Sequence, residues 1–226
     1  MTTALIYFGT GFEWLLSIWI ERWQKAASAS RLVVVTDEDT KIPELPVGVV
    51  YTVLRIKLRT FADILRPEYL MDVKEALALA AAARIPGRLL VVDADALFQH
   101  DPWPTLLGVG ELGAFGMVQD CGERILELGR EGRCPEHNAG VLYFDEESPR
   151  VRVIFQYIRA FNEFKNRPNP QPVILGQRAW SVAHHRLGGK LLPREVNWSH
   201  CWKANPDAAV FHYHGNNGKK KLRATI

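Results

Sequence analysis

Residues 89–95 are an apolar run closed by two acidic side chains, Leu89-Leu90-Val91-Val92-Asp93-Ala94-Asp95. A short, fully apolar run that follows a Pro-Gly pair is typical of a strand buried on both faces. In open α/β sheets, ligands bind at the carboxyl ends of the strands, which is where the two aspartates fall. The run therefore predicts an α/β sheet with a polar site at the carboxyl ends of its strands.

Apolar runs and helical patterns alternate on both sides of this strand. Upstream, we expect strands at 4–8, 31–36 and 49–54, each buried on both faces, and helices at 12–26 and 67–84. Downstream, we expect strands at 114–118 and 141–144, helices at 151–164 and 172–186, and extended segments at 191–197 and 210–214. A glycine-rich loop at 215–218 and a solvated basic tail would follow. The alternation predicts a Rossmann-like α/β fold, a mostly parallel sheet flanked by helices.

The composition is that of an ordinary globular domain. The 226 residues are 47% hydrophobic and 23% charged, which suits one domain spanning 1–226. A net charge of +3 is too small to indicate a polyanion partner across the whole surface. The three cysteines form no disulfide or zinc-knuckle pattern, the N-terminus has no signal-peptide pattern, and no apolar run reaches the ~20 residues that span a bilayer. We therefore expect a cytoplasmic protein without a transmembrane segment.

Asp93 and Asp95 are candidate ligands of Mn²⁺ or Mg²⁺, because two carboxylates just past a buried strand can turn toward one hard cation. The cation could neutralise a diphosphate leaving group. One alternative is a solvated turn. Another is an aspartate-nucleophile phosphatase, which needs Thr or Val where this chain has Leu97, and an Asp-Asp pair that the sequence lacks. The phosphatase is therefore disfavoured.

Two further motifs carry candidate binding residues. His137-Asn138-Ala139-Gly140 opens the strand expected at 141–144, and its small residues would let a ligand approach the backbone. The alternative is a plain turn before that strand. In Phe211-His212-Tyr213-His214-Gly215, the two histidines share one face if the segment is extended, and either could be a third metal ligand. Gly215–Gly218 could present backbone N–H groups to phosphates, with Lys219 adding charge.

In this order, the motifs resemble the GT-A glycosyltransferases, above all family 8, which includes glycogenin and bacterial lipopolysaccharide galactosyltransferases. The matching elements span residues 90–219: Leu90–Asp95, His137–Val141, Gly176-Gln177, Leu192-Pro193 followed by Asn197, and His212–Gly215 with Lys219. Residues 10–12 fit the family's nucleotide-binding start more loosely. The resemblance implies a nucleotide-binding half at 1–98 and a donor-sugar and acceptor half at 99–226.

The resemblance also implies roles for individual residues. The metal ligands would be Asp93, Asp95 and His212, with Ala94 beside them. The nucleotide and diphosphate would meet Thr10, Phe12, Gly215, Lys219 and Lys74, with Arg66 as the alternative to Lys74. The donor sugar would meet Asp120, Asn138, Ala139 and Gln177. The donor would be a UDP-sugar, and the anomeric configuration would be retained.

Three departures from the family pattern affect the donor sugar more than the reaction class. The family usually has Asp-Gln where this chain has Gly176-Gln177, so one sugar contact is missing or supplied elsewhere. The family's lysine sits one residue earlier than Lys219 and is followed by Pro-Trp. His137 stands where an aromatic residue is common.

Other functions stay open. A sugar-phosphate nucleotidyltransferase shares the α/β core, although residues 9–11 lack its following basic residues, and an idle nucleotide-sugar-binding module would not need the acidic pair. We favour a saccharide, a lipid-linked sugar or a protein as acceptor. The basic stretches at 55–59 and 219–223 keep a modified nucleic-acid base as an alternative.

Overall fold

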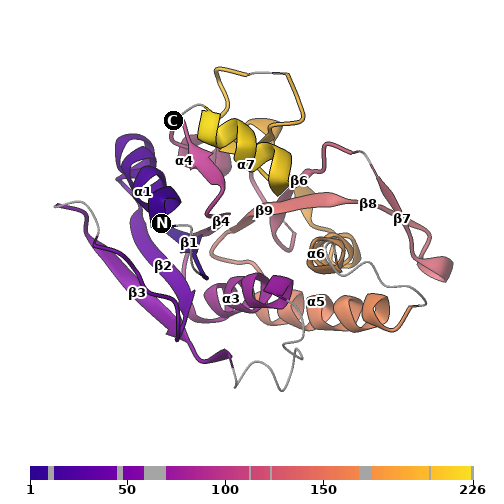
Figure 1. The fold of residues 1–226 in the computed structure, drawn as a ribbon. Coiled ribbons are helices and arrows are strands. Elements are labelled where there is room, and N and C mark those ends of the chain that lie inside the picture. The colour runs from indigo at the N-terminus through magenta and orange to yellow at the C-terminus, as the bar shows by residue number, and fades with distance from the viewer. Residues whose placement is uncertain are drawn as a thin grey trace.

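A seven-stranded sheet forms the centre of the computed structural model, which describes residues 1–9, 13–44, 48–58, 70–111, 113–122, 124–167, 175–203 and 205–224 (Figure 1). Its strand order is β10-β6-β9-β4-β1-β2-β3. The strands are β1 (Thr2–Ile6), β2 (Arg31–Asp37), β3 (Tyr51–Ile56), β4 (Leu89–Asp93), β6 (Gly116–Gln119), β9 (His137–Phe144) and β10 (Lys190–Leu191). Pairing is parallel except where β9 meets β4 and β6.

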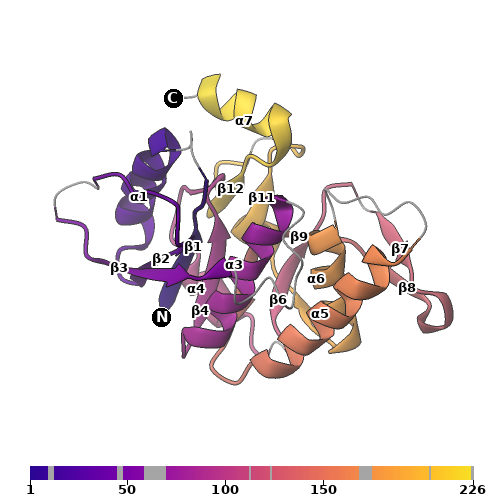
Figure 2. The same cartoon turned by 60° about the horizontal axis from the view of Figure 1, so that its bottom comes forward.

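Helices cover both faces of this sheet (Figure 2). One face packs against α3 (Leu70–Arg84), α5 (Arg150–Lys165) and α6 (Leu175–Arg186). The other packs against α1 (Glu13–Ala27), α4 (Trp103–Gly108), α7 (Gly215–Ala224) and a small sheet of β11 (Trp198–Ser199), β12 (Val210–His212) and β5 (Ala96–Phe98). The alternation of side chains along each strand divides the core between the faces: Ala4 and Ile6 of β1 join the α3 side, and Leu5 joins the α1 side.

The expected class, a mostly parallel sheet flanked by helices, is confirmed. The burial predicted for the strand at 49–54 is wrong, because β3 lies at the edge of the sheet, and Tyr51 and Val53 are each 36% exposed. A β-branched, apolar run cannot distinguish an edge strand from a central one, since both need the same backbone. Among the described residues, no helix combines the length and apolar character needed to span a bilayer.

One predicted loop, and one segment for which a turn was the alternative, are regular structure. Residues 137–140 lie inside β9 and pair with β6 through Asn138–Val118 and His137–Gln119. Residues 215–218 form the first turn of α7, and the basic residues that follow continue the helix to Ala224 instead of fraying. Tertiary packing explains the helix, because Leu222 is buried and Gly218 lies against the backbone of Tyr213.

The short elements were missed altogether. They are β5, α4, β11, and the hairpin of β7 (Ile125–Glu127) and β8 (Arg133–Pro135). Strands of two or three residues are too short to show an alternating pattern. Two of them, β5 and β11, pair with β12 and so place the candidate site residues that follow.

Candidate functional site

Asp93 and Asp95 are brought to a histidine by the small sheet. Asp93 is the last residue of β4, and Asp95 lies in the turn before β5. β5 runs antiparallel to β12, so His212 lies opposite Ala96, and the N–H of Tyr213 donates to the carbonyl of Asp95 at 2.9 Å. The pairing places the imidazole beside the two carboxylates, although the residues are more than a hundred positions apart.

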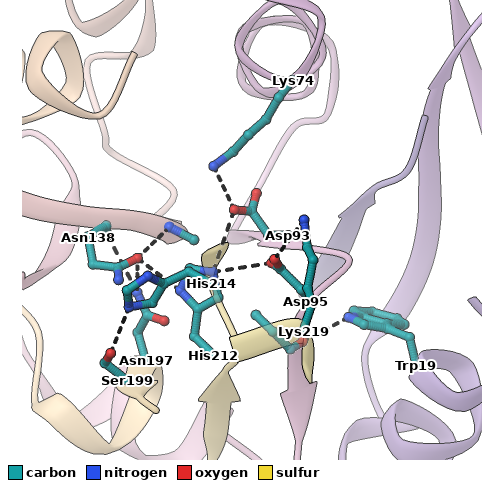
Figure 3. Close-up of polar contacts among 12 residues, drawn as sticks. Trp19, Lys74, Asp93, Asp95, Asn138, Asn197, Ser199, His212, His214 and Lys219 are labelled. Carbon is teal, nitrogen blue, oxygen red and sulfur yellow. Dashed lines mark hydrogen bonds and ion pairs between the residues drawn. The ribbon is translucent and has the colours of Figure 1, made fainter. Parts of the chain in front are cut away.

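The three side chains form a compact group that suits a divalent cation. One ligand atom from each of Asp93, Asp95 and His212 lies within 4.8 Å of the others. His212 Nε2 is 3.2 Å from Asp95 Oδ1 and 3.9 Å from Asp93 Oδ2 (Figure 3). The two carboxylates are only 13% and 15% exposed. Two hard oxygen ligands and one imidazole fit Mn²⁺ or Mg²⁺.

Asn138 holds the imidazole of His212 in one orientation. Its Oδ1 accepts from the N–H of Gly140 at 2.8 Å and from Nδ2 of Asn197 at 3.1 Å, and it lies 3.0 Å from Nδ1 of His212. An amide oxygen can only accept, so Nδ1 carries a proton and Nε2 faces the carboxylates. This arrangement is the usual support for a metal-binding histidine.

Gly140 leaves the space that the imidazole fills. A Cβ on this residue would lie 2.0 Å from Cε1 of His212, far inside any real contact. The small residue was expected to let a ligand approach the backbone, whereas in the structure the protein's own His212 approaches it.

Two lysines pair with the aspartates. Lys74 Nζ is 2.6 Å from Asp93 Oδ2, and Lys219 Nζ is 3.7 Å from Asp95 Oδ2. Burial alone lowers the pKa of Lys74, but the charges of Asp93 and Glu75 reverse this effect and raise it. Both lysines therefore bring positive charge to the edge of the acidic pair.

The pKa values of the two aspartates shift in opposite directions. Burial raises the pKa of Asp93, although the charge of Lys74 opposes the rise. Burial also acts to raise the pKa of Asp95, but the hydrogen bond and charge of His212 outweigh it, with help from Lys219, and the pKa falls to about 2. A dication between the carboxylates would favour the ionised form of both.

Most other predicted site residues lie in the described part of the chain. Gln177, in the first turn of α6, donates from Nε2 to Glu136 Oε1 at 2.9 Å. Asp120 follows β6, and its Oδ2 accepts from the N–H of Gly122 at 3.1 Å. Ala139 is buried in β9, Ala94 lies in the turn between the aspartates, and Gly215 begins α7. Thr10, Phe12 and Arg66 lie outside the described residues, and the expected contacts of all these residues with a donor stay predictions.

Two buried carboxylates were missed from the sequence. Glu136 is 0% exposed and bonds to Gln177. Glu75, next to Lys74 on α3, is 3% exposed and accepts a hydrogen bond from Nε1 of Trp180. A charged residue within the alanine-rich body of a buried helix was the available signal for Glu75, since such residues are seldom buried without a partner.

Glu75 lies beside Gly176, where the sequence departs from the family pattern. A Cβ on Gly176 would lie 2.3 Å from Oε1 of Glu75. The carboxylate of Glu75 therefore occupies the space next to the backbone of residue 176, where the family usually carries an aspartate side chain.

His212 and His214 have different neighbours in the structure. His212 joins Asp93 and Asp95, whereas His214 Nε2 lies 2.8 Å from Oγ of Ser199 and belongs to a separate group with two cysteines. The two rings are adjacent, with centroids 5.1 Å apart.

The fold is similar to that of solved glycosyltransferases. A galactosyltransferase, LgtC, in complex with donor and acceptor sugar analogs matches 96% of this chain and 88% of its own, with a TM-score of 0.68 and 17% identity. A structure of an active-site mutant of LgtC matches with a TM-score of 0.66 and 15% identity, covering 100% of this chain and 95% of its own. The bifunctional glycosyltransferase WbbM matches 95% of this chain but 46% of its own, with a TM-score of 0.61 and 12% identity.

No protein-family model matches this sequence, and neither does any curated protein. At these identities, the likeness to solved structures establishes the fold. The chain has the GT-A glycosyltransferase fold over nearly its whole length, so the expected resemblance is confirmed at that level.

Proposed function

We propose that the protein is a metal-dependent glycosyltransferase that moves a sugar from a UDP-sugar to an acceptor hydroxyl with retention of configuration. The observation that carries the proposal is the group of Asp93, Asp95 and His212 at the carboxyl end of β4, in a GT-A fold. Bound there, Mn²⁺ or Mg²⁺ would stabilise the negative charge of a departing diphosphate.

The chain's own charges support a diphosphate at the same place. Lys74 and Lys219 lie beside the acidic pair, and α7 begins at Gly215, close to β12 in sequence. A helix N-terminus presents unpaired N–H groups and a partial positive charge, which suit a phosphate. The helix thus offers the same backbone donors that the sequence attributed to a loop.

Gln177 and Glu75 are the proposed contacts of the donor sugar. Glu136 can only accept when it is ionised, so Nε2 of Gln177 faces it and the orientation of the Gln177 amide is set. An amide cannot remove a proton, so Gln177 would assist the acceptor hydroxyl by hydrogen bonding and not as a base. Glu75 would supply the carboxylate that the family places at residue 176.

A donor screen tests the proposed reaction. The protein is incubated with Mn²⁺ and a panel of nucleoside diphosphate sugars, and the free nucleoside diphosphate is measured. We expect turnover of a UDP-sugar that stops when the metal is chelated and falls at least about 100-fold in Asp95→Asn. The exposed Asp39→Asn is the matched control and should keep full activity. Tight UDP binding without turnover would favour the idle binding module, and release of pyrophosphate from a nucleoside triphosphate would favour the nucleotidyltransferase.

A rescue experiment tests Glu75. Glu75→Ala should lower kcat/KM, because it removes the carboxylate. Gly176→Asp alone should also lower it, since the new side chain collides with Glu75. The double variant should recover activity, because it restores the family arrangement. A double variant worse than either single one would argue against this role for Glu75.

Two measurements address the remaining parts of the proposal. NMR of the product gives its anomeric configuration, and a β-linked product from an α-linked donor would refute retention. Electrophoretic shift on DNA across a salt series tests the nucleic-acid alternative, and salt-sensitive binding would support it.

A further inference from the structure

A second group of metal-ligating side chains lies next to the acidic site. Cys121 follows β6, Cys201 follows β11, and His214 follows β12, so three separate segments contribute to it. One ligand atom from each lies within 4.8 Å of the other two. Nothing in the proposed glycosyl transfer uses these side chains.

We propose that Cys121, Cys201 and His214 form a zinc site. Nε2 of His214 is 3.9 Å from Sγ of Cys121 and 3.8 Å from Sγ of Cys201, nearly the same distance from each thiol. In a tetrahedral zinc site, bond lengths of about 2.3 Å to sulfur and about 2.0 Å to nitrogen place S and N about 3.5 Å apart. The two nitrogen–sulfur distances therefore need to shorten by only a few tenths of an ångström for the ion to bind.

Ser199 holds His214 beside the thiols in the metal-free protein. The N–H of Cys201 donates to Oγ of Ser199 at 3.2 Å, and that oxygen lies 2.8 Å from His214 Nε2. In the metal-free protein the hydroxyl can donate to Nε2, so zinc binding would replace this hydrogen bond by a bond from the same lone pair to the ion. Cys201 is exposed, so a water molecule can reach the fourth position of the ion.

The two neighbouring sites have different ligand types and should therefore bind different metals. Thiolate and imidazole select Zn²⁺, whereas the carboxylates of Asp93 and Asp95 suit Mn²⁺ or Mg²⁺. Two thiolates neutralise the zinc charge, so the zinc site adds no net positive charge beside the second cation. Binding would also tie the segment that carries Asp120 to the strands that carry Ser199 and His212.

Metal binding would release protons. Burial raises the pKa of the Cys121 thiol to about 11, so this thiol is protonated in the metal-free protein at neutral pH. Zn²⁺ binds two thiolates and one neutral imidazole, and both thiol protons pass to the solvent without any change in oxidation state. Affinity should therefore rise with pH.

Cobalt provides the test, because Co²⁺ bound to thiolates gives a charge-transfer band in the near ultraviolet. The full chain is reduced, stripped of metal and titrated with Co²⁺ and then with Zn²⁺. We expect the band to appear at one equivalent and to disappear as Zn²⁺ displaces cobalt. Cys121→Ser and Cys201→Ser should each weaken binding at least about tenfold and diminish the band.

Two controls isolate the proposed site. Cys134→Ser should keep the band, because Cys134 is buried elsewhere and lies 3.4 Å from the carbonyl of Ser181. Asp95→Asn should also keep it, so loss of the acidic site and loss of the zinc site can be told apart. The proposal is overturned if reduced wild-type protein gives no thiolate band, or if the band survives in both Cys121→Ser and Cys201→Ser. A Cys121–Cys201 disulfide whose reduced form binds no zinc would overturn it as well.

Discussion

Replacing Gly140 by alanine tests the Asp93–Asp95–His212 site without altering a ligand. The new Cβ would lie 2.0 Å from Cε1 of His212, and ordinary contact begins at 3.4 Å, so the ring must move by about 1.4 Å. Metal–ligand distances tolerate only about 0.2 Å. His212 would therefore leave the coordination sphere and lose its hydrogen bond to Asn138. We expect Mn²⁺ affinity to fall about 100-fold, which corresponds to about 2.8 kcal/mol.

Electron paramagnetic resonance of free Mn²⁺ measures this affinity directly, with UDP present and absent. Overpacking should also lower the free energy of unfolding by about 1–3 kcal/mol, so circular dichroism must show that the variant is folded at the assay temperature. Gly108→Ala is the matched control, since a Cβ on Gly108 meets nothing within 4 Å. If folded Gly140→Ala binds Mn²⁺ within a factor of two of wild type, His212 is not the third ligand.

Three other substitutions should change metal binding, the pH dependence of stability and nucleotide binding. Lys74→Met should tighten Mn²⁺ binding about tenfold, because the Lys74 ammonium, 2.6 Å from Asp93 Oδ2, no longer competes for this oxygen. The same substitution should weaken UDP binding. Calorimetry that finds weaker Mn²⁺ binding would contradict this reasoning. Burial lowers the pKa of His137 in the folded protein to about 3. Below pH ~6.5 the unfolded protein therefore binds a proton at His137 that the folded protein does not bind. The folded state loses this contribution to its stability as the pH falls from ~6.5 toward 3. His137→Phe should therefore lose about 2 kcal/mol less than wild type between pH 7 and pH 5 in urea titrations, and equal losses would exclude this cause. Gly218→Ala would place a Cβ 2.3 Å from the carbonyl carbon of Tyr213 and should displace α7. UDP binding measured by calorimetry should then weaken, whereas the control Lys220→Ala, at an exposed position, should leave it unchanged. Unchanged UDP affinity in Gly218→Ala would show that α7 does not contribute to the donor site.

Local patterns were enough to predict the layers of the fold. The long apolar runs at β1, β2 and β4 and the alanine-rich body of α3 each contain their own periodicity, so their type follows from neighbouring residues alone. The edge position of β3 did not follow, because exposure depends on which strand pairs with it. The helical form of residues 215–224 did not follow either, since Leu222 stabilises it by packing against distant elements.

The candidate site divides in the same way. Seven consecutive residues show two carboxylates just past a buried strand. The sequence alone therefore determined the acidic pair and its place at the carboxyl end of that strand. Only the tertiary structure decided that His212 and not His214 joins that pair, that Glu75 fills the space beside Gly176, and that Cys121 and Cys201 meet. Each of these contacts joins residues far apart in the chain. The contact of Glu75 depends on how α3 packs against α6, whereas that of His212 depends on the register of β5 and β12, whose pairing is set by packing and not by their own few residues.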